Sequence, residues 1–294
     1  MNWILSILVW LTYLGSLYFV IFWLLIYLDE PPHPKKKKLK EYPTVSVIVP
    51  AYNEEENIKN TVGSLLKLDY PKDKLEIVLV DDGSKDNTWK IIEKLAAAPS
   101  KFKIKAFHKK NGGKGSAMNY ALRRIKSKYF VCMDADSFIA KNALRYLMPY
   151  FYSDNVAAVL PAMKVKNPKN ILQKLQWYEY IINLFYKDMM GRLGCVSVAP
   201  GPFSVYNADI VRKVGYFDEK NLTEDLEIAL RLQEQDYELV QLMRTEVKTL
   251  APGSLKELYK QRNRWYKGSI LNTIKYKHLL FNRKYGDFGI MQMP

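Results

Sequence analysis

Two aspartates separated by one residue, Asp134 and Asp136, follow an apolar run at 129–133 that is typical of a buried strand. Because side chains alternate along a strand, we expect both carboxylates to point the same way. Such neighbours repel each other unless a cation lies beside them. Carboxylate oxygens suit Mg²⁺ or Mn²⁺, which share their remaining positions with water and substrate phosphates. A solvated turn is the alternative interpretation, because Asp and Ser are common turn formers.

Other polar clusters also fall where strands are expected to end. The apolar run 45–49 leads into the cluster 50–54, and the run 75–80 leads into the cluster 81–84. Segments with helical spacing lie between the strands, which predicts an α/β domain with a mostly parallel, helix-covered sheet. In such sheets ligands bind beyond the carboxyl ends of the strands. The polar clusters should therefore meet at one edge of the sheet.

A glycine-rich segment at 111–115 carries Lys114 just ahead of an expected helix. Small residues let backbone N–H groups and the lysine ammonium approach a phosphate, assisted by the helix N-terminus. The spacing is not that of a Walker A loop, which counts against an ATPase. A flexible turn remains the alternative interpretation of this segment.

The second half of the chain holds two further candidates. Glu224 and Asp225 follow Thr223 at the start of an expected helix, where a capped first turn favours acidic residues. An expected helix over 255–276 carries the motif 261–265, whose Gln, Arg and Trp fall at i, i+3 and i+4 on one face. Its basic residues also allow the interpretation of an amphipathic helix lying at a membrane.

The order and spacing of these motifs resemble those of family-2 glycosyltransferases, especially the membrane-integrated synthases of hyaluronan, chitin, poly-N-acetylglucosamine and cellulose. The resemblance covers residues 45–268 and implies a nucleotide-diphospho-sugar transferase (GT-A type) domain. It implies a UDP-sugar donor and a substrate site formed by Ala51, Tyr52, Glu54, Asp82, Lys114, Asp134, Glu224, Gln261, Arg264 and Trp265. The Gln-x-x-Arg-Trp motif favours the polysaccharide-synthase type over the dolichyl-phosphate mannose synthase type.

The resemblance also implies roles for particular residues. Asp136, helped by Asp134, would bind Mg²⁺ or Mn²⁺ on the donor diphosphate. Asp225 would be the general base that deprotonates the acceptor hydroxyl, so that in-line attack inverts the anomeric carbon. Arg264 would grip the diphosphate, and Trp265 would offer a stacking surface for an acceptor sugar.

Two departures from the family pattern bear on the acceptor. The loop 199–204 contains Pro200 and Pro202, which make it stiffer than the usual small-residue acceptor loop. The family also has several spans after its Gln-x-x-Arg-Trp helix, whereas this sequence stops at Pro294. We expect residues 286–294 to begin a further interfacial or spanning element of a longer protein; an enzyme that does not translocate its product is the alternative.

The N-terminus predicts a membrane anchor. The segment from Trp3 to Leu28 is uncharged and would extend about 39 Å as a helix, enough to cross a bilayer. Residues 29–34 break the helix, and the lysine-rich run 35–40 follows. The positive-inside rule then places the catalytic domain on the cytoplasmic side of the cell (plasma) membrane, where the lysines can contact anionic lipids.

These patterns predict four segments: a transmembrane helix at 1–28, a basic juxtamembrane linker at 29–43, a glycosyltransferase domain at 44–268 and an interfacial segment at 269–294. The formal charge of +15 is spread along the chain, so we expect membrane lipids and phosphate-bearing substrates as partners and no nucleic acid. The histidines lack the spacing of a zinc site, and we expect the two cysteines to be inert core residues.

The expected function is therefore a membrane-anchored, metal-dependent, inverting glycosyltransferase that extends a β-linked glycan. An alternative is a single-addition enzyme acting on a lipid phosphate or lipid-linked acceptor. A non-catalytic nucleotide-sugar scaffold ranks lower, because the carboxylates at Asp134, Asp136 and Asp225 are intact.

Overall fold

The computed structural model describes residues 3–28 and 36–294, which fall into two units, Met1–Lys35 and Lys36–Pro294. Within the first unit, α1 (Trp3–Leu28) is a helix of 26 residues without a buried side chain. Its length and composition are sufficient to cross a membrane. The helix predicted there is present, whereas the expected break at 29–34 and Lys35 lie outside the described residues.

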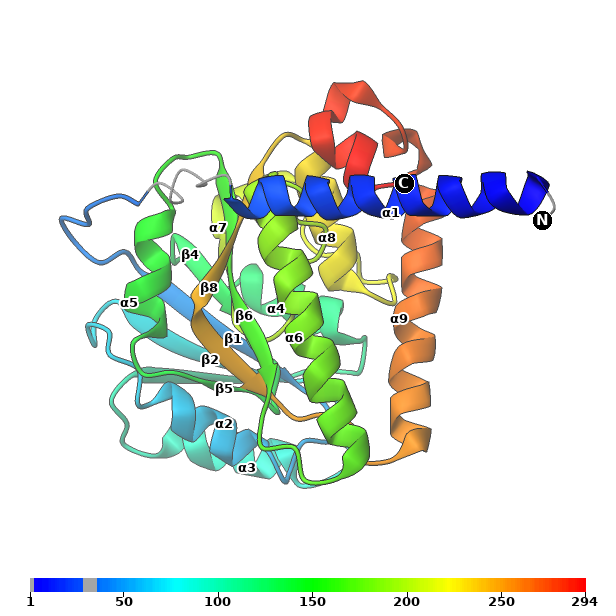
Figure 1. The fold of residues 1–294 in the computed structure, drawn as a ribbon. Coiled ribbons are helices and arrows are strands. Elements are labelled where there is room, and N and C mark those ends of the chain that lie inside the picture. Colours follow the sequence, from blue (N-terminus) through cyan, green and yellow to red (C-terminus); the bar gives the residue numbers. More distant parts are fainter. Residues whose placement is uncertain (1–2, 29–35) are drawn as a thin grey trace. The chain divides into compact units, whose positions relative to one another are not determined.

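The described part of the second unit contains a mixed eight-stranded sheet in the order β3-β2-β1-β4-β7-β6-β8-β5 (Figure 1). The strands are β1 (Val45–Ala51), β2 (Leu75–Asp81), β3 (Lys103–His108), β4 (Tyr129–Cys132), β5 (Phe138–Ile139), β6 (Val156–Val165), β7 (Ser204–Asn207) and β8 (Glu238–Thr249). Strands β1 to β4 pair in parallel, as do β6 and β8. Strand β7 runs antiparallel to β4 and β6, and β5 runs antiparallel to β8. The predicted α/β class is confirmed, with the parallel pairing concentrated in the first half of the chain.

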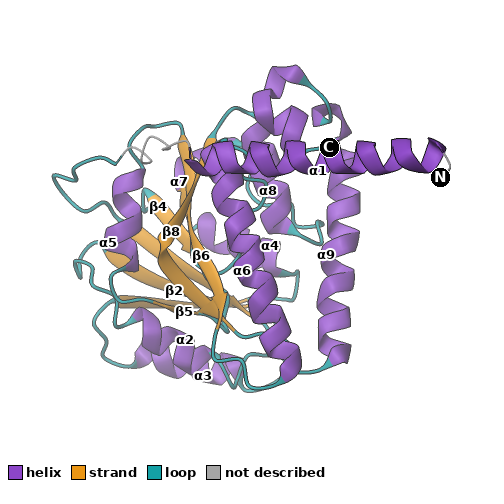
Figure 2. Ribbon diagram, in the orientation of Figure 1, coloured by secondary structure: helices purple, strands orange, loops and turns teal. Residues whose placement is uncertain are grey.

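Helices cover both faces of this sheet because its central strands are apolar on both sides (Figure 2). All seven residues of β1 are buried, and alternate residues face different clusters. One cluster holds α2 (Ile58–Leu65), α3 (Thr88–Ala97) and α5 (Ala143–Leu147). The other holds α4 (Lys114–Leu122), α7 (Ala208–Lys213) and α8 (Glu224–Glu234).

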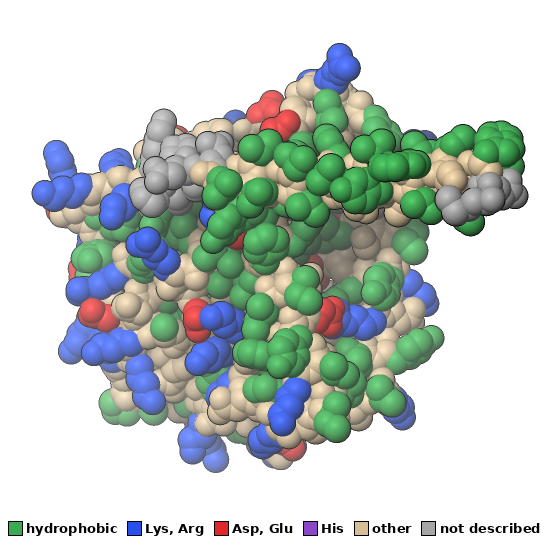
Figure 3. Space-filling model, viewed as in Figure 1, with side chains coloured by type: hydrophobic (Ala, Val, Ile, Leu, Met, Phe, Trp, Pro, Cys, Tyr) green, Lys and Arg blue, Asp and Glu red, His purple; other side chains and the backbone are tan. Residues whose placement is uncertain are grey.

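Two long helices complete the second unit, α6 (Ile171–Arg192) and α9 (Leu255–Lys275). Helix α6 packs against β6 and β8 through one face, and Figure 3 shows hydrophobic side chains gathered over this helix. Helix α9 begins with a capping box between Ser254 and Glu257, which satisfies its first backbone N–H groups. Short turns at Lys277–Leu279, Arg283–Tyr285 and Phe288–Gln292 follow it.

The end of β4 differs from the sequence-based expectation. The strand stops at Cys132, and Asp134 lies in a turn closed by a hydrogen bond from the Ser137 N–H to the Asp134 carbonyl at 3.1 Å. Strand alternation therefore does not orient Asp134 and Asp136, and that reasoning was wrong. The predicted boundary at 268/269 falls inside α9, and the compact unit continues to Pro294.

Candidate active site

A first cavity of about 450 Å³ opens at the carboxyl ends of β1, β2 and β4. Its lining includes every site residue predicted in the first half of the chain, together with one residue of α9. The lining residues are Pro50, Ala51, Tyr52, Glu54, Asp82, Asn111, Gly113, Lys114, Asp134, Ala135, Asp136 and Arg264. The expectation that the polar clusters meet at one edge of the sheet therefore holds.

The loops after β1 and β2 are bound to each other. Asn53 adopts a left-handed backbone conformation with φ of 55°, which asparagine tolerates. Its N–H donates to Ser84 Oγ at 3.0 Å, and its side-chain oxygen accepts from the Lys85 N–H at 2.9 Å. The Glu54 N–H donates to Thr88 Oγ1 at 2.8 Å. These bonds fix the neighbouring Tyr52 at the rim of the first cavity.

Asp82 holds the glycine-rich loop in place. Its buried carboxylate accepts hydrogen bonds from Lys109 Nζ at 2.6 Å and from the backbone N–H groups of Gly112 and Gly113, at 3.1 and 2.7 Å. The Lys114 residue that follows is thereby positioned at the cavity. A direct contact between Asp82 and a uridine stays a prediction, and Lys109 was missed because a lone lysine carries no spacing signal.

Lys114 connects the two halves of the chain. Its ammonium lies 2.6 Å from Asp134 Oδ1 and 3.2 Å from Glu224 Oε1. Burial alone would lower the pKa of Lys114, but the two carboxylates raise it well above its usual value. Gly201 closes over this pair: a β-carbon there would lie 2.9 Å from both carboxylate oxygens of Asp134, and closer still to Lys114 Nζ.

Asp136 has the electrostatics of a cation ligand. Burial, the neighbouring Asp134 and then Glu54 raise its pKa to about 6. The described residues contain no cluster of three or more His, Cys, Asp or Glu side chains that could hold a metal alone. Two carboxylates in one cavity nevertheless fit a Mg²⁺ or Mn²⁺ ion whose other ligands come from water and a bound diphosphate.

A second cavity, of about 400 Å³, contains Asp225 and Trp265. It is enclosed by α6, α8, α9, the loop before β7 and the C-terminal turn, and most of its lining is apolar. The lining residues are Met163, Tyr180, Asn183, Leu184, Lys187, Ser197, Val198, Pro200, Thr223, Asp225, Leu226, Leu230, Trp265, Ser269, Thr273, Gln292 and Met293. Glu224 lines neither cavity, but it bonds to Lys114 of the first cavity, and the next residue, Asp225, lines the second. These two neighbouring residues therefore form a junction between the walls of the two cavities.

Asp225 has the properties of a base that works near neutral pH. Burial and the negative charge of Glu224 raise its pKa to about 6, although Lys114 lowers it in part. It is therefore mostly ionised at pH 7 but more basic than an ordinary aspartate. Thr223 makes no capping bond at the start of α8; its hydroxyl instead accepts from Asn272 Nδ2 at 3.0 Å.

The motif on α9 is divided between the two cavities. Arg264 lines the first cavity and Trp265 the second, so the single face predicted for this motif serves two sites. The Arg262 guanidinium lies 4.5 Å from the centre of the Trp265 ring and holds Glu179 at 2.6 Å. Gln261 lines neither cavity, and its Oε1 is buried without a hydrogen-bond partner among residues 3–28 and 36–294.

Several supporting residues were not predicted. Asn272 and Lys275 lie further along the α9 face that carries Trp265, and Lys275 donates to Glu227 of α8 at 2.9 Å. Tyr276 donates to the same buried carboxylate at 2.6 Å. These residues follow Trp265 with the spacing of one side of a helix, and this pattern could have identified them from the sequence.

Comparisons with known proteins agree with this geometry. Residues 46–215, more than half of the chain, match the family described as glycosyl transferase family 2. A poly-beta-1,6-N-acetyl-D-glucosamine synthase of Staphylococcus epidermidis is 30% identical over 279 residues, which are 90% of this chain and 65% of that protein. The Staphylococcus aureus (strain COL) synthase is 30% identical over 76% of this chain and 54% of its own length. The chain thus spans less than two thirds of these relatives.

Solved structures show the same fold. A mannosyltransferase from Pyrobaculum calidifontis, in complex with GDP-Man and Mn²⁺, has a TM-score of 0.73 at 21% identity, covering 88% of this chain and 71% of that one. Residues 1–349 of TarS from S. aureus, in complex with UDP-GlcNAc, have a TM-score of 0.56 at 23% identity, covering 79% and 66%. The fold class, the strand-end clusters and the sequence matches therefore agree: the chain belongs to glycosyl transferase family 2.

Proposed function

We propose that this glycosyltransferase moves a sugar from a UDP-sugar to a growing β-linked glycan, with inversion at the anomeric carbon. The observation that carries the proposal is the junction at Glu224 and Asp225. Glu224 bonds to Lys114 of the first cavity, while Asp225 lines the second. A donor in the first cavity and an acceptor in the second would meet beside a carboxylate of raised pKa.

The residues then divide the reaction between them. Tyr52 and the loop held by Asp82 form the nucleotide end of the first cavity, and Lys114 and Arg264 bring positive charge to a diphosphate. Asp225 takes the proton of an acceptor hydroxyl. The hydroxyl oxygen bonds to the anomeric carbon as the bond from that carbon to the UDP oxygen breaks. A single attack from the opposite face inverts the configuration.

Asp136 and Asp134 are the residues that would hold Mg²⁺ or Mn²⁺. When bound, the ion neutralises charge on the diphosphate and acts as a Lewis acid on the leaving group. Asp136 lies buried beside Asp134 in this cavity, and both burial and the like charge raise its pKa. A divalent cation bound here would offset the repulsion between the two carboxylates, which supports this assignment. The Mn²⁺ present with the mannosyltransferase of the same fold supports it as well.

The relatives indicate which donor to test first. The synthases are named for a polymer of N-acetylglucosamine, and the TarS complex contains UDP-GlcNAc. We therefore expect UDP-GlcNAc to be turned over fastest in a panel of UDP-sugars, measured as UDP release with and without Mn²⁺. Asp225→Asn should abolish release. Equal turnover of all donors, or full activity in Asp225→Asn, would contradict the proposal.

A second candidate function has a specific observation in its favour. The second cavity is lined largely by apolar side chains, including Met163, Leu184, Leu226 and Met293, which also suit a lipid phosphate or lipid-linked acceptor. Only one sugar would then be transferred. Mass spectrometry of the product separates the two functions, because a polymerase yields a ladder of lengths and a single-addition enzyme yields one mass.

The proposed location is the cytoplasmic face of the cell (plasma) membrane. Helix α1 is long and apolar enough to anchor the chain. The lysines at 36–40 come after it in the sequence, at the start of the catalytic unit. Protease digestion of sealed, right-side-out membrane vesicles tests this orientation. The catalytic unit should be protected until the vesicles are opened.

A further inference from the structure

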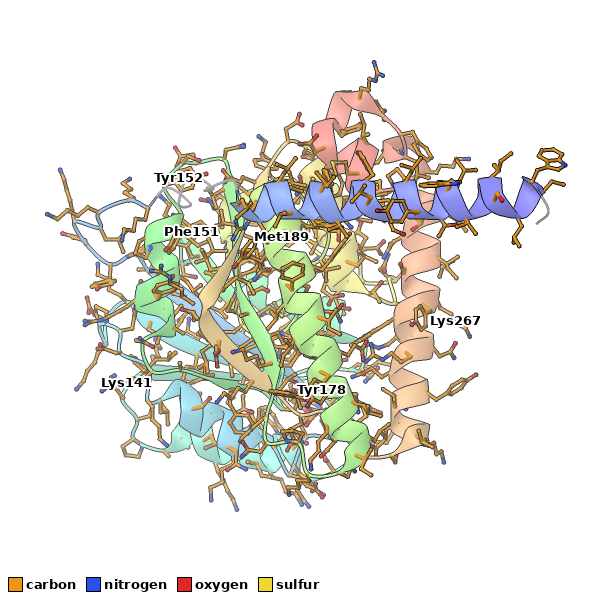
Figure 4. All side chains as sticks on the ribbon, viewed as in Figure 1. Lys141, Phe151, Tyr152, Tyr178, Met189 and Lys267 are labelled. Atoms are coloured by element: carbon orange, nitrogen blue, oxygen red, sulfur yellow. The ribbon has the colours of Figure 1, made fainter. Side chains whose placement is uncertain are left out.

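One face of α6 forms a wall of the second cavity. Tyr180, Asn183, Leu184 and Lys187 all line it, and their spacing of three, one and three residues places them on one side of the helix. The opposite side is exposed, as at Tyr178, whereas Met189 in the last turns is fully buried (Figure 4). Helix α6 therefore presents a lysine to the space in which the acceptor is proposed to bind.

Lys187 differs from the charged residues around it. It makes no hydrogen bond or ion pair with any residue that the structure describes, whereas the adjacent Asp188 pairs with Arg192 at 3.0 Å. Lys187 is half-buried in this wall, and burial lowers its pKa to about 8, a shift that the negative charge of Asp225 partly offsets. Lys114 has two carboxylate partners, whereas Lys187 has none among residues 3–28 and 36–294.

A lone ammonium in a largely apolar cavity defines the ligand chemistry that the cavity accepts. An ammonium group is stabilised by oxygen atoms that accept its hydrogen bonds, and burying it without them is costly. The titratable side chains lining this cavity in the described structure are Tyr180, Lys187 and Asp225. Since Asp225 must reach the attacking hydroxyl, the oxygen for Lys187 has to come from another part of the acceptor.

We propose that Lys187 determines acceptor specificity: it binds a hydroxyl or amide carbonyl oxygen of the acceptor sugar and excludes an acceptor that carries an ammonium group at this place. This inference rests on the proposed function, because it requires a glycan in the second cavity. Lys187 would therefore distinguish two forms of an amino sugar. The N-acetylated form offers a carbonyl oxygen, whereas the form without the acetyl group carries an ammonium that the lysine repels.

The experiment compares two probes on matched variants. The probes are short β-1,6-linked N-acetylglucosamine oligomers and the same oligomers after de-N-acetylation. The dissociation constant of each is measured with UDP present, so that no turnover is needed, and KM and kcat are measured with UDP-GlcNAc. The variants are Lys187→Met, Lys187→Arg and Lys187→Glu, and Lys174→Met at an exposed position of the same helix serves as the control.

We expect the unaltered protein and the Lys174→Met control to bind the acetylated oligomers more tightly. Lys187→Met should weaken their binding at least about tenfold, the effect of losing a hydrogen bond from a charged group. It should also reduce the discrimination between probes. Lys187→Arg should retain most of the discrimination, and Lys187→Glu should reverse it in favour of the cationic oligomers.

Unchanged affinity and unchanged discrimination in Lys187→Met would overturn the inference. A fall in kcat alone would also overturn it, because Lys187 would then act only through the charge of Asp225. Failure of the proposed function is a separate result: binding with the expected discrimination but without UDP release would retain the role of Lys187 and reject the transfer reaction. Melting temperatures of all variants check that each one is folded.

Discussion

The side chain of Thr223, at the start of α8, packs directly against Gly268 of α9. A β-carbon on Gly268 would lie 2.9 Å from the Thr223 Cβ and closer still to its Oγ1. One turn further along α9, Asn272 donates to the Thr223 hydroxyl at 3.0 Å and exchanges hydrogen bonds with Asn221. The position of Asp225 relative to Trp265 therefore depends on the close approach of the two helices.

Gly268→Ala should separate these helices and move Asp225 away from the acceptor. We expect transferase activity to fall at least about tenfold, because displacements of about 1 Å at a reacting group are costly. Unfolding free energy should fall by about 1–3 kcal/mol from overpacking. Activity and thermal unfolding are measured together. Gly63→Ala in α2 is the control: nothing lies within 4 Å of its added β-carbon, so it should keep full activity.

The raised pKa of Asp225 predicts opposite effects on activity and stability. The base must be ionised, so the rate should rise with pH through about 6 and level off above it. Since the folded-state pKa lies above the unfolded value near 3.9, ionisation opposes folding, and this cost grows as pH rises from about 4 to 6.

Asp225→Asn removes that cost together with the base. We expect it to be inactive and about 1–3 kcal/mol more stable than the unaltered protein at pH 7, with little difference at pH 4. Denaturant unfolding at the two pH values measures this. An equal stability difference at both pH values would show that ionisation of Asp225 is not its origin.

Most residues that line the first cavity could be predicted from the sequence, because the strands before them are buried on both faces. Strands β1 and β2 are near-continuous apolar runs, and parallel pairing brings the residues after them to one edge. Asp134 and Asp136 line this cavity as expected, but a turn and not strand alternation places them there, and their role as cation ligands stays a prediction. The local pattern indicated which residues meet at this edge but not their geometry.

The second half of the sheet was harder to predict. Strand β7 has only four residues, and β8 mixes buried with partly exposed positions and has two shifts of register against β6. The insertion of β7 between β4 and β6 depends on tertiary contacts that a local pattern does not record. The contact between Gly268 and Thr223 was missed for the same reason, because a glycine in a helical pattern gives no sign of its neighbour.

Gly201→Ala tests the loop that closes over Lys114 and Asp134. The added β-carbon would lie 2.9 Å from both Asp134 carboxylate oxygens, so the ion pair beneath it must move. We expect KM for the UDP-sugar to rise at least about fivefold, with little change in acceptor KM, because the disturbance lies in the first cavity. Steady-state kinetics with each substrate varied in turn measure both. A rise confined to acceptor KM would contradict the assignment of this cavity to the donor.

Asp136→Asn tests the proposed cation site. Burial, Asp134 and Glu54 all raise the pKa of Asp136 because they oppose its ionisation, and a divalent cation would stabilise the ionised form. The amide lacks that charge. The Mn²⁺ concentration that gives half-maximal activity should therefore rise at least about tenfold, and calorimetry should show weaker binding of UDP in the presence of Mn²⁺. Glu56→Gln removes an exposed carboxylate two residues after Glu54. It is the matched control and should leave both quantities unchanged. If Asp136→Asn kept the Mn²⁺ dependence of the unaltered protein, the cation would have to bind elsewhere.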